Sequence, residues 1–245
     1  MKLHRFIGDF DLSKMVVEIN NPENIKQIKN VLRLGVGDVL ILCDGAGMEA
    51  QAMITSLSKG SIIVEILKQK NSENSLEKSK MKINKEVNLY LAILKKENFE
   101  LAVQKAVECG VSKIIPVITE RTIKTGLNKI RLEKIIKEAS EQSGRNIVPA
   151  LLDTINFKEA LSKRHFDTKD EESGEKIIFH FTDQEYKPNK NTKNASIFIG
   201  PEGGFTEKEI ALAKDFGYKV TSLGSFTLRA ETAAIVGTYR VIQGI

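Results

Sequence analysis

SIFIGPEGGFTEKE (residues 196–209) and LGSFTLRAETAA (residues 223–234) are the two stretches of this chain that decide its fold. Each places a glycine turn between a short apolar strand and the start of a helix. Residues 197–199 are an apolar run typical of a buried strand. Thr206 and Glu209 have the spacing of a capping box, which predicts that a helix begins there. Two such turns at the carboxyl ends of neighbouring strands would line a crevice, where open α/β sheets bind ligands.

The turns carry further signals of a site. Gly200, Gly203 and Gly204 allow positive φ angles and close backbone approach. Residues 220–223, which lead into the second stretch, are predicted as a strand, and a helix is predicted from about residue 230. Arg229 would lie at the start of that helix, where the helix dipole disfavours a cation. This indicates an anionic partner, a carboxylate or a phosphate, although a single glycine turn of this kind is common in α/β proteins.

The residues before these stretches predict the rest of an α/β domain. Residues 98–109 form an amphipathic helix that Gly110 should end. Strands and helices alternate, which predicts a parallel sheet covered by helices on both faces. The predicted elements span residues 87–94 (strand), 98–109 (helix), 113–118 (strand), 128–143 (helix) and 177–181 (strand).

The first 70 residues have a different pattern. Asn21 can cap a short helix whose first position is Pro22. Strands are expected at residues 39–43, 49–57 and 61–67, which is the pattern of a compact β-barrel. Residues 71–86 belong to a polar stretch that reads as a linker, and residues 167–175 form an acidic loop. The predicted domains are therefore residues 1–70 and 87–245.

Composition bounds the function. The chain has 245 residues, of which 41% are hydrophobic and 28% charged, as in an ordinary soluble protein. The net charge of +5 fits a nucleic-acid partner but does not require one. No segment is long and apolar enough to span a membrane, and residues 1–6 lack a signal-peptide core, so a cytoplasmic protein is expected. Cys43, Cys109 and the three histidines are too scattered for a metal site.

The two glycine motifs together resemble the signature of the RsmE family. Similar pieces occur at residues 31–38, 104–112, 119–122 and 138–145. One segment departs from the family pattern, because Lys95-Lys96-Glu97-Asn98 stands where members often read Lys-Gly-Asp-Arg. This departure puts any role of that turn in doubt, whereas the matches span nearly the whole chain.

The resemblance implies a fold and an activity. Members are SPOUT-class enzymes that use S-adenosylmethionine to methylate N3 of a uridine in 16S ribosomal RNA. The implied fold is a C-terminal parallel-sheet domain with a deep trefoil knot and a small N-terminal PUA-like β-barrel that binds RNA. The implied assembly is a homodimer that acts on the small ribosomal subunit.

The resemblance also implies a set of site residues. Cofactor contacts are expected from Ile199, Gly200, Pro201, Glu202, Gly203, Leu223, Gly224, Leu228, Arg229 and Ala230. Arg229 is also the expected catalytic residue, because a cation there would stabilise a developing uracil anion. RNA contacts are expected from Arg5, Arg33, Arg121, Lys124, Gln142 and Arg145.

Several alternatives stay open at the level of sequence. Arg229 could bind the methionine carboxylate or an RNA phosphate instead of the base. Glu202 and Glu231 are both possible proton acceptors, although Glu231 also suits the first turn of a helix. Other possible functions are methylation of a different RNA position such as a ribose 2'-hydroxyl, a non-catalytic role in ribosome assembly, and methylation of a small molecule.

Overall fold

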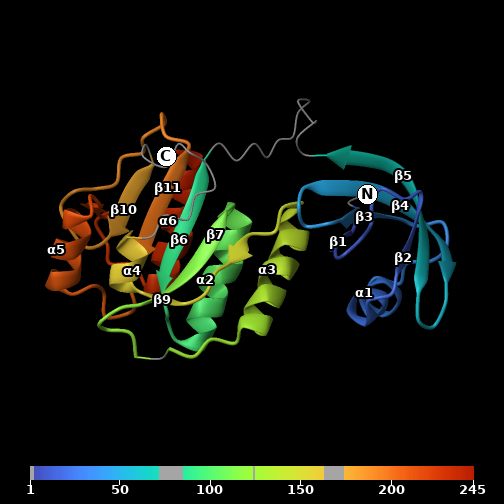
Figure 1. Ribbon diagram of the computed structural model, residues 1–245, viewed down its shortest axis with the longest axis horizontal. Coiled ribbons are helices and arrows are strands. Elements are labelled where there is room, and N and C mark those ends of the chain that lie inside the picture. The colour runs from blue at the N-terminus through green and yellow to red at the C-terminus, as the bar shows by residue number, and fades with distance from the viewer. Residues whose placement is uncertain (1–2, 72–84, 124, 163–173) are drawn as a thin grey trace. The chain divides into compact units, whose positions relative to one another are not determined.

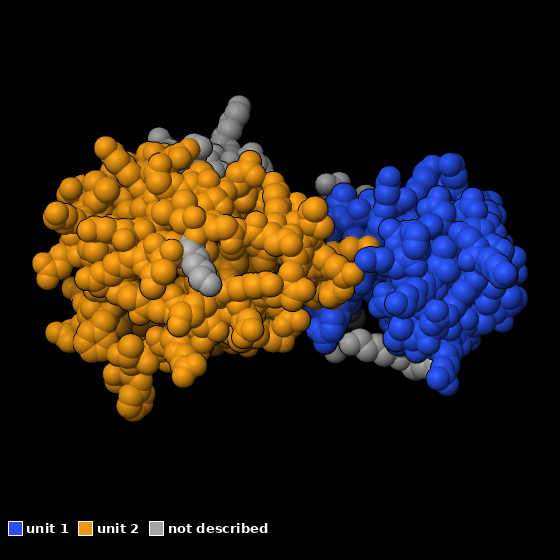
Figure 2. All heavy atoms as spheres, turned by 90° about the horizontal axis from the view of Figure 1, so that it is seen from below, with its two compact units in different colours: residues 1–81, 140–148 blue, residues 82–139, 149–245 orange. Residues whose placement is uncertain are grey.

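The computed structural model describes residues 3–71, 85–123, 125–162 and 174–245. The chain divides into two compact units, coloured in Figure 2: Met1–Met81 with Ser140–Val148, and Lys82–Ala139 with Pro149–Ile245. Most of the predicted linker and of the acidic loop lies outside the described residues. The sequence-based division kept residues 87–245 together, whereas Ser140–Val148 groups with the first unit. The amide of Val148 donates to the carbonyl of Gly45 at 2.9 Å, which ties this segment to the N-terminal sheet.

The first unit is built on a curled five-stranded sheet with the order β1-β3-β4-β5-β2 (Figure 1). The strands at 39–43, 49–57 and 61–67 were predicted correctly to within a few residues, and β1 and β2 were not predicted. The apolar residues of one face form a buried core. The strands are β1 (Arg5–Ile7), β2 (Val16–Ile19), β3 (Val39–Cys43), β4 (Met48–Leu57) and β5 (Ile62–Asn71).

The helical segment near the N-terminus of this unit begins as predicted. The Asn21 side chain accepts hydrogen bonds from the amides of Glu23 and Asn24, at 2.9 and 3.2 Å, and starts α1 (Pro22–Lys26). The helix continues as a π-helical turn, η1 (Gln27–Val31). Two residues later Arg33 has a φ of 55°. This left-handed conformation is costly for a residue with a side chain, so Arg33 occupies a position that a glycine would usually hold.

The second unit confirms the predicted parallel sheet covered on both faces. Its strand order is β12-β10-β11-β6-β7-β8, with β9 beside β7, and every pairing is parallel. The strands are β6 (Glu86–Ala92), β7 (Lys113–Ile118), β8 (Ala150–Leu151), β9 (Ile155–Asn156), β10 (Glu175–Phe179), β11 (Asn194–Ile199) and β12 (Lys219–Thr221). The helices are α2 (Lys96–Cys109), α3 (Lys129–Ser143, whose end from Ser140 groups with the first unit), α4 (Phe157–Ser162), α5 (Glu207–Asp215) and α6 (Ala230–Gln243). The trefoil knot stays a prediction.

Helices α2 and α6 pack together, and α6 covers β6 and β11 (Figure 1). As predicted, Gly110 ends α2 in a left-handed conformation, with a φ of 107°. Gly237 of α6 lies against the ring of Phe179, so that a Cβ on this glycine would stand 3.0 Å from the ring. The close approach of helix to sheet therefore depends on this residue having no side chain. No helix in the described part of the chain is long and apolar enough to cross a membrane.

An aromatic cluster fills the opposite face of the sheet, under α4 and α5. The rings of Tyr90 and Phe198 stack with centroids 4.4 Å apart, and Tyr218 meets Phe198 edge-on at 5.0 Å. Phe157 contacts both Phe198 and Phe205, at 5.5 and 5.3 Å between centroids. Phe205 belongs to the glycine-rich stretch after β11, so the cluster anchors that loop to the core.

A buried ion pair joins the starts of β6 and β10. The ammonium of Lys85 lies 2.5 Å from Glu175 Oε2, and the two side chains are 5% and 8% exposed. Lys85 also donates to the carbonyl of Asn189 at 2.8 Å, and the amide of Asn189 donates to Glu175 at 3.2 Å. These bonds fix the loop that leads into β11.

We expect Lys85→Met to lower the free energy of unfolding by about 3–5 kcal/mol, because it leaves the Glu175 carboxylate buried without its cation. Urea unfolding at neutral pH measures this loss. The double variant Lys85→Met/Glu175→Gln should lose less than Lys85→Met alone, because no buried charge remains. Lys129→Met is the matched control, since its partner Asp153 is 88% exposed and the pair should contribute no more than about 1 kcal/mol. Equal losses in Lys85→Met and Lys129→Met would contradict this account.

Candidate active site

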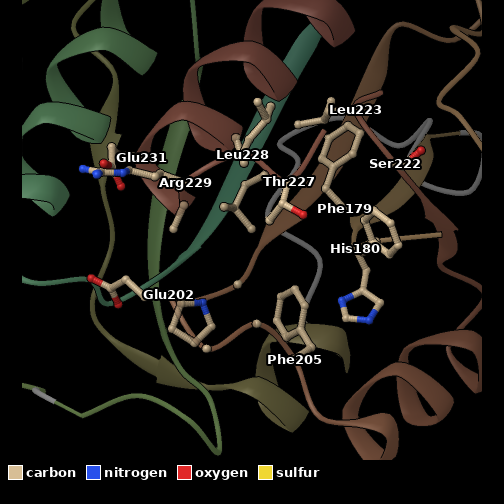
Figure 3. A pocket seen from close by; sticks show the side chains of 18 of the residues that line it. Phe179, His180, Glu202, Phe205, Ser222, Leu223, Thr227, Leu228, Arg229 and Glu231 are labelled. Carbon is tan, nitrogen blue, oxygen red and sulfur yellow. The ribbon is translucent and has the colours of Figure 1, made fainter. Parts of the chain in front are cut away.

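A cavity of about 660 Å³ opens at the carboxyl edge of the sheet in the second unit. Its walls come from the end of β10, the loop after β11, the loop after β12, and the starts of α2 and α6 (Figure 3). All ten residues expected to contact a cofactor line this one cavity: Ile199, Gly200, Pro201, Glu202, Gly203, Leu223, Gly224, Leu228, Arg229 and Ala230. The topology therefore brings the two predicted motifs together, while the ligand of each residue stays a prediction.

The loop after β11 has a fixed shape. Its turn is closed by the Gly204 amide, which donates to the carbonyl of Pro201 at 2.8 Å, and Gly204 has a φ of 68°. The predicted capping box is confirmed: Thr206 Oγ1 accepts from the amide of Glu209 at 3.3 Å, and Glu209 Oε2 accepts from the amide of Thr206 at 2.9 Å. Phe205, between turn and helix, is buried in the aromatic cluster. The loop is thus held at both ends before any ligand binds.

Arg121, expected on the RNA side, contacts this loop. Its guanidinium donates to the carbonyl of Gly203 at 2.6 Å, and its Cδ lies 3.3 Å from the place a Gly203 Cβ would occupy. The neighbouring amide of Glu120 donates to Glu209 Oε1 at 2.9 Å, and Thr206 Oγ1 donates to Glu120 Oε2 at 3.0 Å. The turn after β7 therefore braces the glycine loop from outside, and the missing side chain at Gly203 leaves room for the arginine to pack closely against it.

Four charged side chains line the cavity near the starts of α2 and α6. Glu202 Oε1 accepts from the backbone amide of Lys95 at 3.1 Å, and both residues are exposed. Arg229 is the N-cap of α6, is exposed, and makes no capping hydrogen bond through its side chain. Glu231, in the first turn of α6, is 7% exposed, and its Oε2 has no hydrogen-bond partner among the described residues.

The cavity also contains residues that the sequence analysis missed. His180 follows the last residue of β10, and Phe181 follows it at 70% exposure. Burial, together with the positive charge of Arg121, lowers the pKa of His180 from its ordinary value of 6.5. The imidazole is therefore neutral at pH 7 and can accept a proton. The predicted strand ran to residue 181 and so hid the point where the chain leaves the sheet. The end of this strand was the sequence signal that could have identified His180 as a residue at the carboxyl edge of the sheet.

The remaining residues expected to bind RNA lie outside this cavity. In the first unit, Arg5 donates to Glu49 Oε2 and to Cys43 Sγ, both at 2.8 Å, and its side chain is 13% exposed. That ion pair leaves little of the Arg5 guanidinium for a polyanion. Arg33 is exposed. Gln142 and Arg145 group with the first unit, and burial lowers the pKa of Arg145 to about 10, so it stays charged at neutral pH. Lys124 lies outside the described residues.

The first unit has a groove of its own, of about 500 Å³. Lys26, Lys29 and Lys59 line it together with Asn20 and Asn30, and no carboxylate does. Lys29 donates to the backbone carbonyl of Ser58, which holds its ammonium in place. Three cations and two amides without an acidic residue make a lining that suits phosphate groups.

Metal and disulfide chemistry find no support in the described residues. No group of three or more histidine, cysteine, aspartate or glutamate side chains is placed to hold a metal ion there. Cys43 and Cys109 are free thiols. Burial raises the pKa of Cys43 to about 11, so this thiol is neutral and unreactive.

If the hydrogen bond from Arg121 to the Gly203 carbonyl holds the glycine loop, its removal should make that loop more mobile. Arg121→Met keeps an aliphatic chain over Gly203 but removes the donor to its carbonyl, a bond of about 1 kcal/mol. We expect amide hydrogen exchange in residues 200–206 to become about fivefold faster, while the β6 amides are unchanged. The control is Arg131→Met, because Arg131 is also exposed but pairs with Glu100 on α2. Unchanged exchange in Arg121→Met, or an equal change in Arg131→Met, would show that the contact does not hold the loop.

Comparison with known proteins agrees with this geometry. Residues 81–241 match the family model of an RNA methyltransferase domain, and residues 19–67 match that of an RNA methyltransferase PUA domain. The chain is 33% identical to the ribosomal RNA small subunit methyltransferase E of Rickettsia conorii, over 92% of this chain and 88% of that protein. It is 36% identical to the protein of the same name in Mesomycoplasma hyopneumoniae, over 71% of this chain and 77% of that one.

A solved structure is similar over nearly the whole chain. The ribosomal RNA small subunit methyltransferase E of Neisseria gonorrhoeae, crystallised with S-adenosylmethionine, superposes with a TM-score of 0.82 and 30% identity, over 97% of this chain and 95% of that one. The two matched domains, the relatives and the two-motif cavity all agree, and this chain belongs to the RNA methyltransferase family of the small-subunit methyltransferase E proteins.

Proposed function

We propose that this protein transfers a methyl group from S-adenosylmethionine to N3 of a uridine in 16S ribosomal RNA. The observation that carries the proposal is the meeting of the two glycine motifs around one cavity at the carboxyl edge of a parallel sheet. The names of the relatives, all ribosomal RNA small subunit methyltransferases, supply the substrate class.

The cavity fits S-adenosylmethionine in size and in lining. Sites for ligands of this size commonly enclose about 300–1,000 Å³, and this one encloses about 660 Å³. Phe179, Ile199 and Leu223 offer an apolar wall for a purine ring. Gly200 and Gly203 leave the backbone of one loop accessible to polar edges. When bound, the cofactor supplies an electrophilic methyl group carried on a sulfonium.

The protein's part in the reaction is to position the base and to manage a proton. Uridine N3 carries a hydrogen that must leave as the nitrogen–carbon bond forms. Neutral His180 can accept that proton, whereas Glu202 already accepts a hydrogen bond from Lys95. The exposed rings of Phe181 and Phe226, at 70% and 86%, lie at the cavity and can stack on an unpaired base. Holding the nitrogen in line with the methyl group supplies much of the rate.

The partners follow from the same proposal. Lys26, Lys29 and Lys59 in the groove, with exposed Arg33, give the first unit a cationic surface for RNA phosphates. We expect the functional assembly to be a homodimer, with a solution mass twice that of the chain, and a monomer by light scattering would contradict this. The proposed substrate, the small ribosomal subunit, places the protein in the cytoplasm; a fluorescent fusion that localises elsewhere would contradict that.

The test is methyl transfer from labelled S-adenosylmethionine to small ribosomal subunits that lack the modification, followed by nucleoside analysis. We expect label in 3-methyluridine, and binding of the unmodified RNA should weaken steeply as salt rises. The variant Arg229→Ala should lose most of the label, because Arg229 lines the cavity and its charge has no ion-pair partner in the described part of the chain. Label in a 2'-O-methylated nucleoside would show that the target is a ribose hydroxyl and not N3 of uridine, while the assignment of the cofactor would stand. Failure to bind S-adenosylmethionine would favour a non-catalytic assembly role.

A proton acceptor at His180 predicts a pH dependence. Only the neutral imidazole accepts a proton, so the rate should be full above the His180 pKa and fall as pH drops through it. Because that pKa is lowered, the midpoint of the acid limb should lie below pH 6.5. His180→Gln should reduce kcat by about 10²-fold or more and remove this limb. A variant that keeps the wild-type rate and profile would exclude His180 from the reaction.

A further inference from the structure

The start of α6 presents two opposite charges that have no partner. Arg229 caps the helix and Glu231 lies in its first turn, and both line the cavity (Figure 3). No ion pair involves either residue in the described part of the chain, and none joins them to each other. Glu231 is 7% exposed, and its Oε2 accepts no hydrogen bond from any described residue.

Both charges are costly as they stand. A buried carboxylate without a partner loses its hydration and gains nothing in return. The dipole of α6 favours the anion at Glu231 but disfavours the cation at Arg229. Buried polar atoms without partners are rare in proteins, so such an atom in the wall of a cavity indicates a group that arrives with the ligand. Glu231 requires a donor, and Arg229 requires an acceptor.

We propose that Arg229 and Glu231 together bind the zwitterionic amino-acid end of S-adenosylmethionine, Arg229 through its α-carboxylate and Glu231 through its α-ammonium group. This inference rests on the proposed function. An adjacent anion and cation in the ligand match an adjacent cation and anion on the protein. Of the three partners that the sequence left open for Arg229, the unpaired carboxylate of Glu231 beside it selects the methionine carboxylate, because a phosphate or a uracil anion would leave Glu231 unpaired.

The distribution of charged and apolar residues around the cavity indicates which end of the cofactor lies at which side. Arg229 and Glu231 stand on one side of it, and the apolar residues Phe179 and Leu223 stand on the other (Figure 3). The adenine belongs to the apolar side and the amino acid to the start of α6. Lys95 is a competing cation of the cavity, but it is the N-cap of α2, and its backbone amide donates to the exposed carboxylate of Glu202.

The test compares ligands that differ only at the amino-acid end. S-adenosylhomocysteine carries the carboxylate and the ammonium, and 5'-methylthioadenosine carries neither. In calorimetric titrations of the full chain, Glu231→Gln should weaken S-adenosylhomocysteine binding about 10- to 100-fold and leave 5'-methylthioadenosine binding within about twofold. Arg229→Gln should do the same with a smaller loss, since its charge is more exposed to solvent. The Tm of unliganded Glu231→Gln should equal or exceed that of the wild type, because the variant removes an unpaired buried charge.

A third ligand separates the two contacts. Decarboxylated S-adenosylmethionine keeps the ammonium group but lacks the carboxylate. Arg229→Gln should bind it as well as the wild type does, and Glu231→Gln should bind it less well. Lys95→Met is the matched control and should leave all affinities within about twofold.

The outcomes distinguish this inference from the proposed function. Equal wild-type affinities for S-adenosylhomocysteine and 5'-methylthioadenosine would overturn the inference alone, as would a loss in Lys95→Met that exceeds the loss in Arg229→Gln. A wild-type protein that binds neither ligand would overturn the proposed function itself.

Discussion

Strand β11 is the constraint on which the second unit depends. It pairs in parallel with β6 on one side and β10 on the other, and all six of its residues are buried. A strand with two partners and two covered faces has no freedom of register, because a shift by one residue would exchange its two faces. The packing of Phe198 and Phe205 in the aromatic cluster fixes the position of its carboxyl end, and therefore of the glycine loop. Everything at the cavity is positioned relative to that end.

The charges around the glycine loop divide into two kinds. Glu120, Arg121 and Glu209 all form hydrogen bonds within the glycine loop or between it and the turn after β7, and these bonds hold the cavity wall in shape. Arg229 and Glu231 are unsatisfied in the described chain, although they lie only two residues apart. In such a site some charged groups hold the wall rigid and others are left unpaired. The site is therefore preorganised, because the unpaired charges are already in place on folding and gain their partners when the ligand binds.

The elements read correctly from sequence are those with local causes. The capping box at Thr206, the cap at Asn21 and the stop at Gly110 each act within a few residues, so spacing alone reveals them. Strands of two to four residues, such as β1, β2, β8 and β9, were missed because their partners lie far along the chain and no periodicity fits in so few residues. The same reason explains the site: the two motifs predicted ten wall residues, whereas the Arg121 brace and the place of His180 come from tertiary packing that no local pattern encodes.

The segment Ser140–Val148 has a consequence for how the protein is made. It belongs to the first unit, yet more than fifty residues of the second unit precede it in the chain. A ribosome that adds about 5–20 residues per second needs several seconds to pass from residue 81 to residue 148. During that interval the N-terminal sheet has emerged without the Val148 amide that bonds to Gly45. The second unit's first strand and helices are therefore synthesised before the first unit is complete. The first unit cannot finish folding until part of the second has been made, and a gene cut at residue 81 would encode only part of a unit.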